Sequence, residues 1–331
     1  MGQPRVVRQL AAELNAGRLA HAYVFVGPQG TGRATAAKAL FQAANCLNPA
    51  EGAPCGACGP CHRLAAGTHE DFLVLAPSTD SASAQIKVEE VREVIRTMGF
   101  APFAGGWRMV LIKEAGRLNP FSANALLKTL EEPPPKNILV LTVEDPAELL
   151  PTLVSRCRRV NFRPLDEALV AEELIRRKVD PKAARLKAAL SNGSLGRALT
   201  LDQERMAGDL GRLRGYLAGP AGPLQDWTFA EETVAPFRGG EFLDRRGLAE
   251  ALGLWALYFR DQAFSAADRA QAALMPPEEG RGQRLAMAAA LKGFVGVRRA
   301  QARILQNAAP ELTVAVLLQE LSRLGEVKDP G

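Results

Sequence analysis

The sequence predicts an α/β fold in which a parallel sheet is followed by a helical region. Short apolar runs alternate with helical patterns up to about residue 164, as in sheets whose parallel strands are joined by helices. The first run, residues 23–26, leads into Gly27-Pro28-Gln29-Gly30-Thr31-Gly32 and then a helix, which is the outline of a P-loop. From Asp166 onward the composition predicts helices alone.

Composition limits the class of protein. A chain of 331 residues with 47% apolar content is long enough for two or three domains. No apolar run approaches the roughly 20 residues that span a bilayer, and the N-terminus lacks a signal-peptide core, so we expect a cytosolic protein without a membrane partner. The net charge of +5 is modest. It neither demands nor excludes a nucleic-acid partner, but it argues against a dedicated DNA-binding protein.

The glycine loop keeps the scaffold of a phosphate site and lacks its chemistry. After Gly27 and Gly32, a working P-loop needs Lys to reach the phosphates and Ser or Thr to hold Mg²⁺. Arg33 and Ala34 stand at these positions. The planar fork of Arg does not replace the compact ammonium of Lys, and Ala has no oxygen. An ordinary glycine-rich turn is the alternative. The P-loop is favoured because the next helix carries apolar residues at the spacing of a packed face, Ala37, Leu40, Phe41 and Ala44.

The second ATPase motif is altered as well. A strand over residues 107–112 ends in Lys113-Glu114. In P-loop NTPases an Asp at the end of this strand positions Mg²⁺. Lys113 places a positive charge where the metal would sit. Two independent losses predict that the chain does not hydrolyse ATP at its own site.

Four cysteines follow the P-loop helix. Cys46, Cys55, Cys58 and Cys61 are set among glycines and prolines, with two-residue gaps between the last three. Such gaps let neighbouring thiolates reach one ion, and four thiolates form a closed tetrahedral Zn²⁺ site. Disulfides are the alternative, but the cytosol is reducing. His62 or His69 could replace one ligand. We therefore expect a structural zinc module over residues 46–61, inserted before the next strand.

The remaining elements complete the sheet and the helical part. We expect strands at 72–75, 138–142 and 159–162, and helices at 5–20, 121–132, 166–178, 181–190, 195–209, 243–263, 281–307 and 311–325. A further helix contains Val88, Val91 and Ile95. These elements divide the chain into predicted domains at 1–164, 165–209 and 210–331.

Three motifs together carry a family resemblance. They are the run Leu126-Leu127-Lys128-Thr129-Leu130-Glu131-Glu132-Pro133, the trio Ser155-Arg156-Cys157, and the four-cysteine module. With them the chain resembles the bacterial replicative clamp-loader branch of AAA+ proteins. The motor subunits of that complex keep both ATPase motifs, and this chain is similar to the subunits that keep Ser-Arg-Cys and lose both. The similarity runs motif by motif to about residue 210, and beyond that it rests on length and helical character.

The resemblance implies an architecture and a set of partners. It implies an AAA+ domain with the zinc module at 1–164, a small helical lid at 165–209 and an all-α collar at 210–331. The partners would be the gamma/tau and delta subunits in a hetero-pentamer, with the sliding clamp and primed DNA bound by the assembled loader. The one cofactor of the chain would be structural zinc.

The resemblance also implies roles for single residues. Arg156 would act in trans on ATP bound by a neighbouring subunit, whereas the plainer reading places it in a basic surface with Arg158 and Arg159. Thr142 would be a vestigial γ-phosphate sensor. Arg197, in Gly193-Ser194-Leu195-Gly196-Arg197, would be the second sensor, and a packing or ion-pair role is as good an account of it.

Two other functions are open at this point. A divergent ATPase that tolerates Arg33 and Lys113 would hydrolyse Mg-ATP as an isolated chain. A zinc-dependent nucleic-acid-binding module would bind primed DNA alone and lose it with the zinc. The second alternative leaves the Ser-Arg-Cys trio unexplained.

Overall fold

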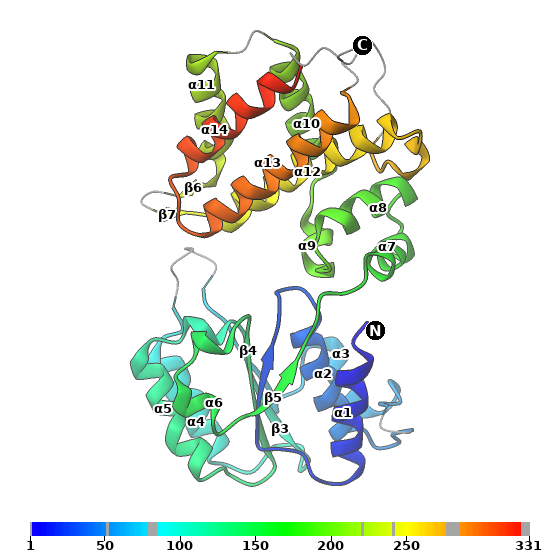
Figure 1. The fold of residues 1–331 in the computed structure, drawn as a ribbon. Coiled ribbons are helices and arrows are strands. Elements are labelled where there is room, and N and C mark those ends of the chain that lie inside the picture. The colour runs from blue at the N-terminus through cyan, green and yellow to red at the C-terminus, as the bar shows by residue number, and fades with distance from the viewer. Residues whose placement is uncertain are drawn as a thin grey trace. The chain divides into compact units, whose positions relative to one another are not determined.

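The computed structural model describes residues 2–50, 53–78, 85–219, 222–239, 242–275 and 285–325. The chain forms two compact units (Figure 1). Unit 1 comprises Met1–Val170 and Asn192–Arg197, and unit 2 comprises Ala171–Ser191 and Ala198–Gly331. The boundary near residue 170 lies close to the predicted end of the first domain. The finer division into a lid and a collar stays a prediction.

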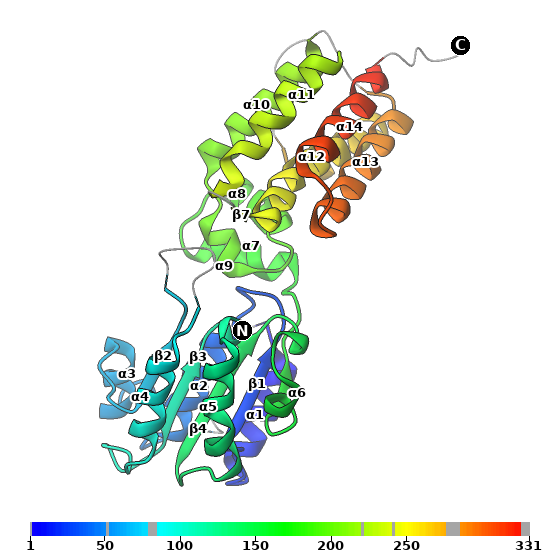
Figure 2. The same cartoon turned by 90° about the vertical axis from the view of Figure 1, so that its left-hand side faces the viewer.

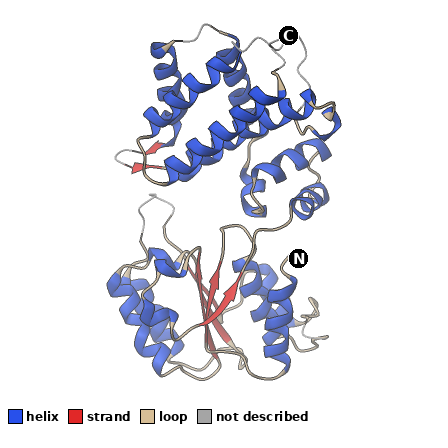
Figure 3. Ribbon diagram, viewed as in Figure 1, coloured by secondary structure: helices blue, strands red, loops and turns tan. Residues whose placement is uncertain are grey.

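Unit 1 is built on a five-stranded parallel sheet in the order β2-β3-β4-β1-β5, which confirms the predicted α/β class (Figure 3). The strands are β1 Ala22–Val26, β2 Phe72–Leu75, β3 Arg108–Ile112, β4 Asn137–Val143 and β5 Arg158–Asn161. Strands β1, β3 and β4 lie inside the sheet and are buried along their whole length. Their continuous apolar runs follow from burial on both faces.

Helices cover both faces of the sheet (Figures 1 and 2). One face carries α1 Pro4–Asn15, α2 Arg33–Ala44 and α3 Gly59–Ala66, and the other carries α4 Val88–Met98, α5 Pro120–Glu131 and α6 Pro151–Val154. Side chains alternate across β1, so Tyr23 and Phe25 enter the core under α2, while Val24 enters the core under α5. Two cores therefore clamp the sheet from both sides.

Local signals explain several element ends. The side chain of Asn119 accepts a hydrogen bond from the Ser122 amide at 2.8 Å, and Pro120 is the first residue of α5, one residue before the predicted start. Helix α1 ends at Asn15 and not at residue 20, because the chain turns at Gly17, whose φ is 62°. Short 3-10 turns lie at Ala115–Arg117, Pro146–Glu148, Ala235–Phe237, Ala270–Ala272 and Arg323–Gly325.

Unit 2 is helical, with one small hairpin (Figure 3). Its helices, of which α7 and α9 cross the unit boundary, are α7 Glu167–Arg176, α8 Pro181–Leu190, α9 Leu195–Thr200, α10 Gln203–Ala218, α11 Pro223–Val234, α12 Arg245–Ala266, α13 Met287–Leu305 and α14 Pro310–Ser322. The hairpin pairs β6 Arg238–Gly239 with β7 Phe242–Leu243. Helix α12 is central and buries Trp255 and Phe259 against α13 and the neighbouring helices.

The helical part differs from the sequence prediction at three points. The predicted helix 195–209 is two helices, because Asp202 caps a new one by accepting from the amides of Glu204 and Arg205. Helix α13 starts at Met287, and residues 281–284 of the predicted helix lie outside the described residues. Helix α11 was not predicted. Within the described ranges, no helix is long and apolar enough to cross a bilayer.

Candidate functional site

The glycine loop Gly27–Gly32, predicted to be a degenerate P-loop, lies at the carboxyl edge of the sheet. It follows β1 directly, and the Gly27 amide donates to the Val143 carbonyl of β4 at 3.1 Å. The loop is held by its own chain, since the Thr31 hydroxyl donates to the Pro28 carbonyl at 2.7 Å and the Gly196 amide donates to the Gly30 carbonyl at 3.2 Å. Ala34 follows Arg33 in the first turn of α2 and offers no oxygen to a metal.

Arg33 is buried in the first turn of α2, although its position is that of a phosphate-binding lysine. The residue is 6% exposed, and its Nη1 makes no hydrogen bond within the described residues. Burial lowers the pKa of Arg33, and three nearby carboxylates, Glu144, Glu148 and Glu114, act in the opposite direction. The charge of Arg33 is therefore partly offset by carboxylates of its own chain.

The altered metal motif meets the first sensor position at the same edge. Lys113 follows β3, and its amide donates to the Leu75 carbonyl at 2.8 Å, while its side chain is exposed. The Glu114 amide donates to the Thr142 hydroxyl at 3.1 Å, and Gln29 of the loop reaches the Glu114 carboxylate at 3.4 Å. The structure thus brings together Gly27, Gly32, Arg33, Glu114 and Thr142. In this structure the side-chain hydroxyl of Thr142 accepts a hydrogen bond from a backbone amide.

Arg197 lies in the segment of unit 1 that closes over the loop. Its amide donates to the Ser194 hydroxyl at 3.1 Å. A Cβ added to Gly30 would lie 2.1 Å from the Ser194 hydroxyl, so this close approach requires glycine. The segment 192–197 and the loop therefore pack directly, backbone against backbone.

Arg156 lies at the opposite edge of the sheet. It follows α6 and precedes β5, whose first residue, Arg158, pairs with Tyr23 near the start of β1. Four residues of β1, or roughly 13 Å of strand, separate this level from Gly27. Arg156 therefore cannot serve the P-loop of its own chain. Its Nη1 donates to the Thr152 carbonyl at 3.0 Å, and its Nη2 lies 2.8 Å from Oε1 of Glu131.

The neighbours of Arg156 have separate partners. Arg158 forms an ion pair with Glu13 at 2.8 Å, and Arg159 donates to the side chain of Asn161 at 2.8 Å. Cys157 is half-buried, and burial raises the pKa of its thiol to about 12, which makes a nucleophilic role unfavourable. Arg156, Arg158 and Arg159 thus each have a partner within their own chain.

The four cysteines predicted to bind zinc lie together in space. Their sulfur atoms all lie within 4.8 Å of one another, and the Sγ atoms of Cys46 and Cys58 are 4.0 Å apart. In a tetrahedral site with Zn–S bonds of about 2.3 Å, the sulfurs are separated by slightly less than this. The cluster spans the turn after α2 and the start of α3, with Cys58 preceding that helix and Cys61 buried in its first turn.

The backbone around the cluster is arranged for thiolates. The Cys55 amide donates to the Cys46 sulfur at 3.2 Å, and the amides of Ala57 and Cys58 donate to the Cys55 sulfur at 3.4 Å each. Backbone donors lower the pKa of Cys58 to about 6, whereas burial raises that of Cys61 to about 11. The four sulfurs fit a zinc ion in number, chemistry and spacing. His69 is not part of this group: its ring packs against Phe41, and its Nδ1 accepts from the Asp71 amide.

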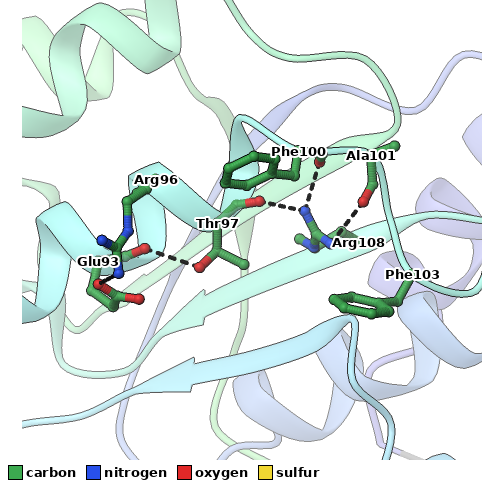
Figure 4. A pocket seen from close by; sticks show the side chains of 7 residues that line it. All are labelled: Glu93, Arg96, Thr97, Phe100, Ala101, Phe103 and Arg108. Carbon is green, nitrogen blue, oxygen red and sulfur yellow. Dashed lines mark hydrogen bonds and ion pairs between the residues drawn. The ribbon is translucent and has the colours of Figure 1, made fainter.

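One charged network was not predicted from the sequence. Arg108, at the start of β3, is 1% exposed and forms an ion pair at 2.9 Å with the fully buried carboxylate of Asp71. It also donates to the carbonyls of Thr97, Phe100 and Ala101 (Figure 4). Asp71 in turn accepts from the amides of Phe103 and Ala104. These bonds hold segment 97–104 beside a pocket of about 590 Å³.

The architecture of unit 1 defines the class of protein. A parallel sheet with a glycine loop between its β1 strand and α2, and with motif residues at the ends of β3 and β4, is a P-loop domain of the AAA+ type. A family model described as DNA polymerase III, delta subunit, matches residues 2–166. The chain belongs to this family of DNA polymerase III clamp-loader subunits, in its delta-prime branch.

Sequence relatives agree with the family model. The chain is 34% identical to the DNA polymerase III subunit delta-prime of Bacillus subtilis, over 57% of this chain and 56% of that protein. It is 39% identical to the delta-prime subunit of Pseudomonas aeruginosa, over 53% of each chain. With the subunit tau of Escherichia coli the identity is 36%, over 63% of this chain and 33% of tau. The matches thus span from a third to just over half of these relatives.

Solved structures with a similar arrangement were also found. A gamma subunit-related protein of DNA polymerase III from Thermotoga maritima aligns with a TM-score of 0.38 and 17% identity, over 96% of this chain and 99% of that chain. The RuvB Holliday junction branch migration motor of the same organism aligns with a TM-score of 0.40 and 19% identity, over 76% and 82%. Family membership comes from the sequence relatives and the family model.

Proposed function

We propose that this chain is a non-hydrolysing subunit of the replicative sliding-clamp loader, working in the cytoplasm with gamma/tau and delta subunits, and that it supplies Arg156 to the ATP site of a neighbouring subunit. The sliding clamp and primed DNA would be partners of the assembled loader. Kinship with delta-prime and tau proteins supports these partners.

The observation that carries the role of Arg156 is its position. It lies at the sheet edge opposite its own P-loop, so it cannot contact a phosphate bound at that loop, and its position supports a role toward a neighbouring subunit. An arginine supplied across an interface neutralises the charge that develops on the transferred γ-phosphate, and it makes hydrolysis depend on correct assembly. The chain's own site lacks the lysine, the hydroxyl and the metal-binding aspartate, with Arg33, Ala34 and Lys113 in their places.

The test is ATP turnover by a loader reconstituted from gamma/tau, delta and this chain, with clamp and primed DNA. We expect Arg156→Ala to lower turnover by roughly tenfold or more, as removal of an arginine finger does. Arg159→Ala is the matched control, because it removes a neighbouring exposed cation whose recorded partner is Asn161. Native mass spectrometry establishes that each variant assembles. Unchanged turnover with an intact assembly would refute the finger.

The same preparation separates this function from a divergent ATPase. The isolated chain should show no Mg-ATP hydrolysis above background. Turnover by the isolated chain that disappears in an Arg33→Ala variant would favour the ATPase instead.

We further propose that Cys46, Cys55, Cys58 and Cys61 hold a structural zinc ion, and that the lid and collar divide near residue 210. Zinc would fasten the turn between α2 and α3, with no ligand position left for a substrate. The purified chain should contain one zinc ion by elemental analysis. Cys58→Ser should abolish it and lower the thermal unfolding temperature, whereas Cys157→Ala should retain the metal. A purified wild-type chain without zinc would contradict the site. An unfolding temperature that does not change when a chelator removes the metal would contradict its structural role.

The helical unit offers a surface for ring neighbours. Met287, Leu291 and Val295 recur every four residues on α13 and are 50%, 47% and 52% exposed. Leu291 and Val295 line a groove of about 520 Å³ that also includes residues of α14. An exposed apolar stripe of this kind supports the proposal that this unit is the oligomerising collar.

A further inference from the structure

An exposed ion pair joins Glu131 and Arg156, which are 25 residues apart in the sequence. Glu131 is the last residue of α5, six residues before the first residue of β4, and Arg156 stands two residues before the first residue of β5. Both residues therefore reach the same edge of the sheet. Nη2 of Arg156 lies 2.8 Å from Oε1 of Glu131, and Nη1 donates to the Thr152 carbonyl at 3.0 Å.

These two bonds anchor the guanidinium and leave part of it available. An arginine has five N–H donors, and the recorded bonds of Arg156 use two of them. Its side chain is 36% exposed, and that of Glu131 is 53% exposed. The remaining donors can meet an oxyanion that approaches from solvent while the two anchors stay in place.

A free arginine side chain has four rotatable bonds and samples many rotamers. Holding it in one orientation before a partner arrives removes that entropy cost from the assembly step, and a group that must meet a developing charge is most effective when it is already oriented. The Thr152 carbonyl fixes one end of the guanidinium, and the Glu131 carboxylate fixes the other. Two anchors that come from different helices define its plane.

We propose that Glu131 is a positioning residue that orients Arg156 for the phosphate of a neighbouring subunit. This inference rests on the proposed function of Arg156 and deepens it, because it assigns a task to the first glutamate of the Glu131-Glu132 pair. Glu132 has no ion pair among the residues that the structure describes. The two adjacent glutamates should therefore behave differently.

The test uses the reconstituted loader and the variants Glu131→Ala, Glu131→Gln, Glu132→Ala and Arg156→Ala, with the Glu131→Ala/Arg156→Ala double variant. We expect Glu131→Ala to lower kcat for ATP by about two- to fivefold, the range that an exposed ion pair supports, with little change in KM. Glu131→Gln, whose amide oxygen still accepts from Nη2, should retain more than half of the wild-type rate. Glu132→Ala should match the wild type.

The double variant separates positioning from a general structural effect. If Glu131 acts through Arg156, the double variant is no slower than Arg156→Ala, whereas independent losses would multiply. Native mass spectrometry and the thermal unfolding temperature confirm assembly and folding for each variant. A Glu131→Ala effect that persists in the Arg156→Ala background, or a rise in turnover on removal of Glu131, would overturn the inference.

The outcomes also distinguish this inference from the function beneath it. If Arg156→Ala leaves turnover unchanged, the proposed function fails and the inference fails with it. If Arg156→Ala lowers turnover while Glu131→Ala does not, the finger stands and only the positioning role is lost.

Discussion

Two arginines of the sheet domain hold carboxylates at nearly the same distance and differ in every other respect. Arg108 lies 2.9 Å from Asp71 with both side chains buried, and its further donors go to backbone carbonyls. Arg156 lies 2.8 Å from Glu131 with both side chains partly exposed. The first network is complete within the chain, and the second has capacity left for a partner. Burial and the use of donors, and not the distance, separate the structural pair from the candidate functional pair.

The largest effect should come from breaking the buried pair. Asp71→Ala or Arg108→Ala leaves a buried charge without its partner, which should lower the free energy of unfolding by about 3–5 kcal/mol. Segment 97–104 would also lose its anchor. Urea unfolding of the full chain measures the change in the free energy of unfolding. Hydrogen exchange of the β3 amides reports that change for unit 1. A loss below about 1 kcal/mol would place this pair in the same class as the exposed one.

A smaller loss of stability should appear at low pH, when His69 is protonated. The Nδ1 atom of His69 accepts from the amide of Asp71, a member of the same network. Burial lowers the pKa of His69 below its ordinary value of 6.5, and Arg63 acts in the same direction. The unfolded state therefore binds the proton more readily. Stability from this residue is complete above about pH 7 and declines as the pH falls through 6.5, by at most about 1.4 kcal/mol per pH unit.

The measurement for His69 is the free energy of unfolding between pH 5 and 8. His69→Gln should flatten the decline, and His62→Gln, which removes an exposed imidazole, should leave it as it is. An unaltered pH dependence in His69→Gln would assign the decline to other groups.

The smallest effect on stability should come from the exposed pair. Glu131→Ala should change the free energy of unfolding by less than about 1 kcal/mol, and added salt should shrink the difference further. Chemical denaturation at low and high ionic strength tests this. A loss as large as that of Asp71→Ala would make Glu131 a structural residue and remove the contrast.

Much of the sheet domain followed from local patterns. The inner strands β1, β3 and β4 are short buried runs that are mostly apolar, the start of α5 is signalled by Asn119-Pro120, and the cysteine cluster follows from spacing alone. The cap residue Asp202 signals the start of α10, but the helical pattern continues across residues 195–209 and predicts one helix there.

The charged networks could not be predicted in the same way. Arg108 and Asp71 are 37 residues apart, and Arg156 and Glu131 are 25 apart, so their partners are chosen by the order of strands in the sheet. A sequence pattern reports periodicity and caps. It does not report which loops meet at one edge. Nor did it indicate that Arg33 would be buried among carboxylates of its own chain.

The packing around Gly30 explains why the loop needs its glycines. Gly196 donates its amide to Gly30, and a side chain at Gly30 would collide with Ser194, while one at Gly27 would lie 2.3 Å from the Phe162 carbonyl. The fold itself therefore requires these glycines, whether or not a nucleotide binds at the loop. A glycine signature of this kind records a packing constraint as well as a phosphate-binding pattern, and Arg33→Lys would change one letter of the motif without altering that packing.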